Sequence, residues 1–261
     1  MKNKIVSFIT LMIFVFSFSV SLADSSSLDL SNINQGVVGV SYQDSDSKYK
    51  LMVKKGNEKY YYDLVDEQDY FPLQMGSGQY EVALMKNVSG NKYSYVETAD
   101  ILLEGEYEEN LYLSSIQIVD INENPKAVEL AKELTKGLET DKEKFQAIYQ
   151  YVISNISYDY EKISSLGTVY VPRPDQTLSE GKGICYDYSS LMAVMLRSVN
   201  VKTKLVKGYS DNVTSYHAWN EVMIDGEWKI VDSTSDAAYA KSNVAYNTFK
   251  SEASYDSEKV Y

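Results

Sequence analysis

The chain has 261 residues, of which 44% are apolar and 24% are charged. This composition is typical of a globular protein and excludes a disordered chain, a collagen-like repeat and a polytopic membrane protein. Acidic residues outnumber basic ones by 37 to 25, for a formal net charge of -12, so nucleic acid is not an expected partner. One cysteine and one histidine exclude an intramolecular disulfide and a Cys/His zinc cluster.

The first 23 residues have the features of a secretory signal peptide. Lys2 and Lys4 precede an apolar run over residues 5–20, and Ser21-Leu22-Ala23 fits the small-x-small pattern of a signal-peptidase site. We expect cleavage after Ala23 and a secreted or cell-surface protein without stable membrane insertion. An uncleaved membrane anchor is the alternative, because the apolar run is near the lower length of a spanning helix.

Residues 24–120 are predicted to form a β-rich N-terminal domain. Short segments rich in tyrosine and β-branched residues alternate with turns that contain glycine or asparagine. The expected strands cover residues 36–40, 49–53, 59–64, 79–85 and 92–96. A spacing of roughly ten residues between such strands is typical of a small antiparallel sandwich.

Helical character begins at Pro125, after which apolar residues recur at helical spacing. Thr140 and Glu143 form the pattern of a capping box, which predicts the start of a second helix. Residues 158–179 are predicted to be a long loop, and long loops in compact domains are often functional. Residues 236–261 are polar, and three alternatives stay open for them: they wrap the core, add a strand or are partly disordered.

The single cysteine lies at a position suited to nucleophilic chemistry. Gly181 and Gly183 lead into Cys185, and an apolar helical run follows through Leu196. We therefore expect Cys185 at or near a helix N-terminus, where unpaired amides and the helix dipole favour a thiolate over a thiol. Backbone N–H groups at the same place could face a developing oxyanion.

The single histidine is expected to meet a carboxylate across a hairpin. Residues 216–224 and 227–232 are β-like, and Asp225-Gly226 between them is a two-residue hairpin turn signal. This register pairs position 217 with about 234, which brings Asp232 close to His217. A carboxylate beside an imidazole fixes the tautomer and stabilises the imidazolium.

Three motifs carry a family resemblance. They are Gly-x-Gly-x-Cys-x-Asp-Tyr-Ser at 181–189, His-Ala-Trp-Asn-Glu-Val at 217–222 and Asp-Gly-x-Trp-x-x-Val-Asp-Ser-Thr at 225–234. In order and spacing the chain resembles the transglutaminase-like superfamily, above all its secreted bacterial members. The resemblance implies an α+β fold with a papain-like core over residues 121–261, built from N-terminal helices, a nucleophile helix and an antiparallel sheet. It also implies a triad of Cys185, His217 and Asp232.

Four further residues are candidates for the site. The backbone N–H of Cys185 is one oxyanion donor candidate, and Tyr170 and Gln176 are the candidates for a second. Arg173 stands between two prolines and could hold a substrate carboxylate, although a solvated surface arginine is the alternative. Trp219 either packs in the core or screens the site.

The reaction expected from the triad is acyl transfer through a Cys185 thioester, with protein or peptide amides as substrates. Water as acceptor gives hydrolysis, an amine gives a crosslink, and the triad alone does not distinguish them. Amides of peptidoglycan stems or glycopeptides are a narrower version of the same hypothesis. A non-catalytic cell-surface binding module on this scaffold is the alternative from another class. No metal or cofactor is expected, and the sequence leaves the oligomeric state open.

Overall fold

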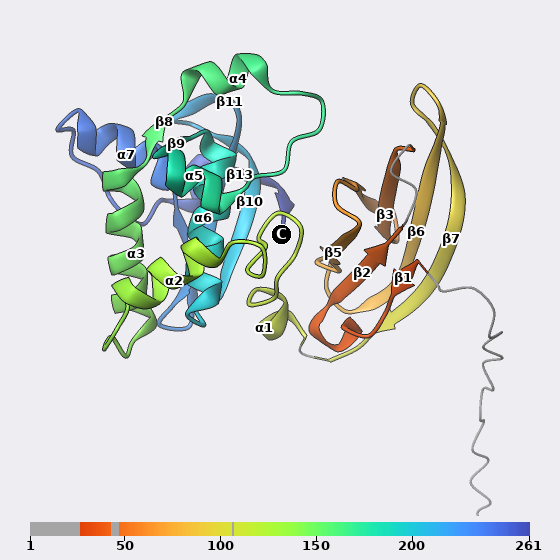
Figure 1. Cartoon of the computed structure of the whole chain (residues 1–261). Helices are drawn as coiled ribbons and strands as arrows, with labels where there is room; N and C mark the ends of the chain where they lie inside the picture. Colours follow the sequence, from red (N-terminus) through yellow and green to blue (C-terminus); the bar gives the residue numbers. More distant parts are fainter. Residues whose placement is uncertain (1–26, 43–46, 106) are drawn as a thin grey trace, which may run out of the picture.

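The computed structural model describes residues 27–42, 47–105 and 107–261. The predicted signal peptide, residues 1–23, lies outside the described residues. Figure 1 shows a β part and an α+β part side by side, joined by the segment that carries the short helix α1 (Glu108–Leu111). Among the described residues, no helix is both long enough and apolar enough to cross a membrane.

The N-terminal part consists of two antiparallel sheets. One has the order β1-β2-β5 and the other the order β4-β3-β6-β7. The bounds are β1 Leu28–Asp29, β2 Val37–Ser41, β3 Tyr49–Lys55, β4 Glu58–Asp63, β5 Gln68–Pro72, β6 Gly78–Ser89 and β7 Lys92–Leu103, with the 3-10 turn η1 at Ile33–Gln35. The five strands expected from the sequence are all present. β1 and β5 were not expected, because β1 has only two residues and β5 starts with polar residues and ends at a proline.

The C-terminal part packs helices against a sheet of order β12-β11-β10-β13. Its elements are α2 Pro125–Leu134, α3 Asp141–Asn155, β8 Ser157–Tyr158, α4 Tyr160–Ser165, α5 Pro174–Glu180, β9 Lys182–Gly183, α6 Cys185–Ser198, β10 Thr203–Ser210, β11 Val213–Ile224, β12 Glu227–Val231, α7 Ser233–Lys241, η2 Glu252–Ser254 and β13 Tyr255–Val260. The α+β class with a nucleophile helix and an antiparallel sheet is thereby confirmed.

Local sequence signals fixed some of these elements and misled at one place. The capping box is confirmed, since the Thr140 N–H donates to Glu143 Oε2 at 3.0 Å and the Glu143 N–H to Thr140 Oγ1 at 3.2 Å. The predicted long loop over 158–179 is wrong, because it contains α4 and α5. Asp159 caps α4 with its side chain and Pro174 opens α5, so Pro174 marks the start of a helix and not a loop. Of the three alternatives for the tail, the added strand occurs as β13 beside β10.

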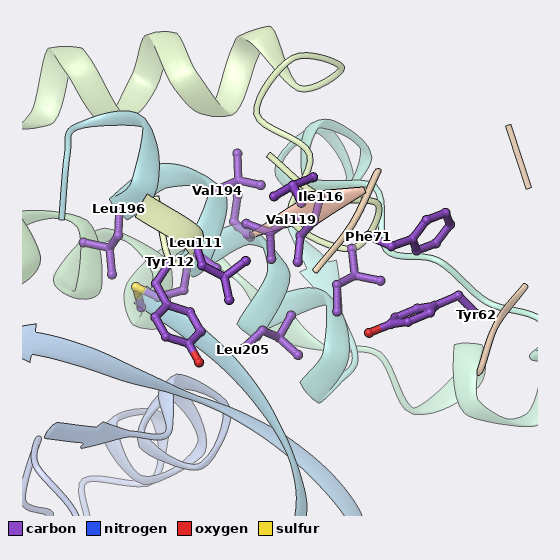
Figure 2. Close-up of a cluster of buried hydrophobic side chains, with 14 of the residues drawn as sticks. Tyr62, Phe71, Leu111, Tyr112, Ile116, Val119, Val194, Leu196 and Leu205 are labelled. Atoms are coloured by element: carbon purple, nitrogen blue, oxygen red, sulfur yellow. The ribbon is translucent and has the colours of Figure 1, made fainter. Parts of the chain in front are cut away.

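A single apolar cluster runs through both parts. It joins buried strand residues of the N-terminal sheets to α6 and β10. Figure 2 shows Tyr62 and Phe71 of the N-terminal part beside Ile116 and Val119, with Leu205 of the C-terminal sheet close by. The two parts therefore share one core.

Polar and aromatic contacts also fix the two parts relative to each other. The Tyr261 ring packs edge-on against Tyr60 and Tyr62, at centroid distances of 5.8 and 6.1 Å. Arg173 Nη2 donates to both oxygens of Asp66, at 3.1 and 2.7 Å. The C-terminus accordingly lies between the two parts in Figure 1.

Candidate active site

Cys185 is the first residue of α6, as the glycines before it predicted. The preceding Ile184 is extended (φ -90°, ψ 175°), so the chain turns into the helix at the cysteine itself. Cys185 is half-buried, and its thiol forms no disulfide bond. Residues 187–197 of the same helix are all buried, which anchors the nucleophile on a rigid element.

A buried carboxylate holds the start of this helix. Asp187 is fully buried and accepts hydrogen bonds from the Ile184 N–H at 2.9 Å, from Lys162 Nζ at 2.8 Å and from the Tyr170 hydroxyl. A Cβ at Gly183 would lie 2.6 Å from the Cβ of Asp187, so only glycine fits there. Asp187 thus ties α4 and the loop before α5 to the first turn of α6.

The histidine and its carboxylate are positioned by the predicted hairpin. Ile224 pairs with Glu227 across Asp225 and Gly226, which have φ values of 52° and 80°; both lie in the left-handed region that a two-residue turn of this kind requires. Asp232 does not lie on the paired strand itself, because β12 ends at Val231. It is instead the N-cap of α7, where its side chain accepts the Ser235 N–H at 3.0 Å.

His217 and Asp232 form a buried pair, with 2.9 Å between Nε2 and Oδ2. The exposed fraction is 3% for His217 and 0% for Asp232. Oδ2 of Asp232 also accepts from the Ser235 hydroxyl at 2.7 Å and from the Tyr255 hydroxyl at 3.0 Å. Tyr255 is a partner that the sequence analysis missed, because nothing in the sequence indicated where the tail would pair.

The pair is electrostatically matched. Burial opposes charge on His217, but hydrogen bonds to Asp232 and Cys185 outweigh it and raise the pKa of the imidazole from 6.5 to about 10. Burial likewise opposes charge on Asp232, yet the His217 and Ser235 contacts lower the pKa of its carboxyl. Because Asp232 engages Nε2, the ring nitrogen left for the Cys185 thiol is Nδ1. At neutral pH the imidazolium is therefore held between a carboxylate and the cysteine.

The raised pKa can be measured directly, because His217 is the only histidine in the chain. We expect its ring to keep its proton well above pH 6.5 and to lose it only as the pH rises through the raised pKa. Asp232→Asn should move the midpoint back toward 6.5, since the neutral amide no longer stabilises the charge. Proton–carbon NMR spectra of the ring, from about pH 5 to about pH 11, give both midpoints. A wild-type midpoint at or below 6.5 would contradict the prediction.

Cys185 and His217 both line an open cleft of about 510 Å³. One wall comes from α4 and the residue that follows it, and the other from β11 and α7. A second pocket of about 640 Å³ continues from it and shares Tyr158, Tyr160, Thr234 and Ala238. Within the described parts of the chain, no three His, Cys, Asp or Glu side chains are grouped so that they could hold a metal ion.

The structure brings Cys185, His217 and Asp232 together but places the other candidates elsewhere. The Tyr170 hydroxyl is bonded to Asp187, and the ring lines a pocket between the two parts. Gln176 Nε2 donates to Glu180 Oε1 at 2.7 Å on an exposed face of α5. Together with Arg173, which is bonded to Asp66, these side chains are not among those that line the cleft. Their predicted roles at the site have no support in this geometry.

Trp219 is a packing residue in this structure. It is 1% exposed and lies edge-on against Tyr255 at 5.0 Å. Its ring is also 6.3 Å from that of His217. Trp219 therefore packs against His217 and Tyr255 and helps to position them, but it does not line the cleft.

The chain is similar to known proteins over the part that carries these three residues. Residues 128–233 match the model of the transglutaminase-like superfamily. Kyphoscoliosis peptidase of Mus musculus and that of Homo sapiens are each 30% identical over 136 residues, which is 46% of this chain and 20% of either relative. This chain thus spans about a fifth of the length of those relatives.

Among solved structures, a candidate cysteine protease of Cytophaga hutchinsonii is similar at 18% identity and a TM-score of 0.44, over 76% of this chain and 71% of that one. The residues that match the family model contain Cys185, His217 and Asp232. Residues 128–233 of this chain are thus similar to a transglutaminase-like core.

Proposed function

We propose that this protein is an exported cysteine-dependent acyl-transfer enzyme that acts on protein or peptide amides at the cell surface. The observation that carries the proposal is His217, held between Cys185 and a buried Asp232 at an open cleft. The peptidase name of the kyphoscoliosis relatives supports the same chemistry.

In the first half of the reaction, the Cys185 thiolate attacks the amide carbonyl carbon and forms a C–S bond. The C–N bond then breaks, and the imidazolium of His217 gives its proton to the leaving amine. The developing oxyanion faces the first turn of α6, whose N–H groups have no partners within the helix. The Cys185 N–H is the donor we assign there.

In the second half, water or a primary amine attacks the thioester carbon. Neutral His217 takes the proton from this nucleophile, the C–S bond breaks and the Cys185 thiolate is restored. Asp232 keeps Nε2 protonated throughout, so that Nδ1 always faces the sulfur. Hydrolysis and transamidation use the same residues and differ only in the acceptor.

The proposal is tested with p-nitrophenyl acetate, which acylates reactive thiols without a recognised substrate. We expect mass spectrometry to find one acetyl group on Cys185, formed much faster in the wild type than in His217→Ala and released faster when a primary amine is added. Cys185→Ser is the matched control, because that variant has no thiol. Equal rates of acylation in wild type and His217→Ala would favour the non-catalytic binding module instead.

The export part of the proposal has its own test. N-terminal sequencing of the protein recovered outside cells should begin at Asp24. Recovery only in the membrane fraction, with Met1 or Lys2 still present, would mean that the segment is an anchor.

A further inference from the structure

Apart from the reacting residues themselves, the cleft beside Cys185 is lined by neutral side chains. Fifteen residues line it, and none of these described side chains is Asp, Glu, Lys or Arg. Charged residues make up 24% of the chain, and its formal net charge is -12. The lining of the Cys185 cleft therefore lacks the charged residues that are common elsewhere in this acidic chain. Cys185 and His217 are the lining residues that carry charge in the proposed reaction, and His217 is already paired with Asp232.

The walls of the cleft expose apolar and aromatic side chains. Tyr160 is 78% exposed and Ile163 50% exposed on the α4 side, and Tyr216 is 44% exposed on the β11 side. Large apolar groups gathered at the mouth of a cleft mark a surface that a ligand covers. Because these side chains flank the nucleophile, the ligand that covers them is the substrate.

The shape of the cleft favours a chain over a small molecule. Tyr158 and Tyr160 belong both to the Cys185 cleft and to the neighbouring pocket of about 640 Å³, which extends toward α3 and the end of α7. Both hollows are open to the surface, and residues of α7 contribute to the lining of both. An extended polypeptide would pass the nucleophile and continue into the second pocket.

We infer that the acyl donor is an extended polypeptide segment with neutral apolar or aromatic side chains next to the reactive amide, and that Tyr160, Ile163 and Tyr216 select it. This inference rests on the proposed function, because it assigns the substrate class of the Cys185 site. A charged side chain would lose its water against these walls without gaining a partner, and that loss opposes binding. Segments with Asp, Glu, Lys or Arg next to the reactive amide are consequently poor substrates.

The test uses three chloromethyl ketones that alkylate Cys185 and differ only in their peptide: acetyl-Leu-Phe-Gly, acetyl-Glu-Asp-Gly and acetyl-Lys-Arg-Gly. Each second-order rate is divided by the rate for iodoacetamide in the same protein, which reports thiol reactivity alone. We expect the ratio for the apolar peptide to exceed the other two by about tenfold or more. Equal ratios for all three peptides would overturn the inference.

Charge placed on the wall should change the selectivity. In Ile163→Lys we expect the ratio for the acidic peptide to rise by about fivefold and that for the apolar peptide to fall. Val88→Lys is the matched control, because Val88 is 66% exposed on β6, far from the cleft in sequence and on the N-terminal sheet. An unchanged acidic-to-apolar ratio in Ile163→Lys would contradict the role of this wall.

The same experiment distinguishes failure of the proposed function from failure of the inferred substrate class. An iodoacetamide rate that is the same in wild type and His217→Ala would overturn the proposed function itself. A histidine-dependent iodoacetamide rate with no preference among the peptides would leave the enzyme assignment intact and remove only the substrate class.

Discussion

Asp232→Asn is expected to slow acylation of Cys185 by on the order of 10²- to 10⁴-fold while leaving the fold intact. In the wild type the Asp232 carboxylate accepts the Nε2–H of His217 at 2.9 Å, so Nδ1 is free to exchange a proton with Cys185. An asparagine amide can donate to Nε2 instead, which puts the ring proton on Nδ1 and leaves no base facing the thiol. The buried imidazolium also loses its only carboxylate partner among the described contacts.

The choice of asparagine separates chemistry from folding. Asp232 is also the N-cap of α7 and accepts the Ser235 N–H at 3.0 Å, and asparagine caps helices about as well as aspartate does. Tyr255→Phe removes another donor to the same carboxylate without changing the charge on Asp232, and we expect it to cost less than about tenfold. Acylation rates with p-nitrophenyl acetate, checked against circular dichroism, measure both variants. Acylation of Asp232→Asn within about threefold of wild type would contradict the assigned role.

The sequence could predict this pair because every step was local. The turn residues Asp225 and Gly226 set the hairpin register, and the register alone carried residue 232 to within reach of His217. The position of Cys185 followed in the same way from the glycines and the apolar run around it. The short-range rules of turns and helix caps were enough to predict the positions of those site residues that lie on adjacent elements.

The supporting contacts could not be predicted because they join segments distant in sequence. Asp187 accepts hydrogen bonds from Lys162 on α4 and from Tyr170 in the segment between α4 and α5, where the sequence analysis expected one long loop. The hydroxyl of Tyr255 reaches Asp232 only because β13 adds to the edge of the sheet beside β10. Pairing of this kind depends on tertiary packing. A polar tail has no periodic pattern of apolar residues from which such pairing could be predicted.

The same limit applies to the relation between the two parts. Composition changes near residue 120, and the sequence analysis therefore expected a domain boundary there. In the structure the Gln117 N–H donates to the Tyr70 carbonyl at 2.8 Å and its side chain to the Asp63 carbonyl at 2.7 Å. The segment before α2 is thus bonded into the N-terminal sheets, and the apolar cluster continues through it. A change in composition marked a change of secondary structure within a shared core.

Phe71→Ala is expected to lower the free energy of unfolding of both parts together, by about 3–5 kcal/mol. Phe71 is fully buried in β5, its ring is 4.9 Å from that of Tyr62, and both belong to the cluster that reaches α6 and β10. Truncation to alanine removes the apolar contacts and leaves a cavity that the surrounding strands only partly close. Because the cluster is continuous, this loss should also destabilise the C-terminal part around α6 and β10.

Both tryptophans make that coupling measurable. Trp219 and Trp228 lie on β11 and β12 of the C-terminal sheet, so tryptophan fluorescence in a denaturant titration reports unfolding of that part. In Phe71→Ala its midpoint should fall together with the far-ultraviolet circular dichroism midpoint, whereas Val88→Ala, at a position 66% exposed, should shift neither. A fluorescence midpoint that stays at the wild-type value in Phe71→Ala would mean that the two parts unfold independently. The N-terminal sheets would then be a separate domain, as the sequence alone suggested, and the cluster between the parts would contribute little to the stability of the C-terminal part.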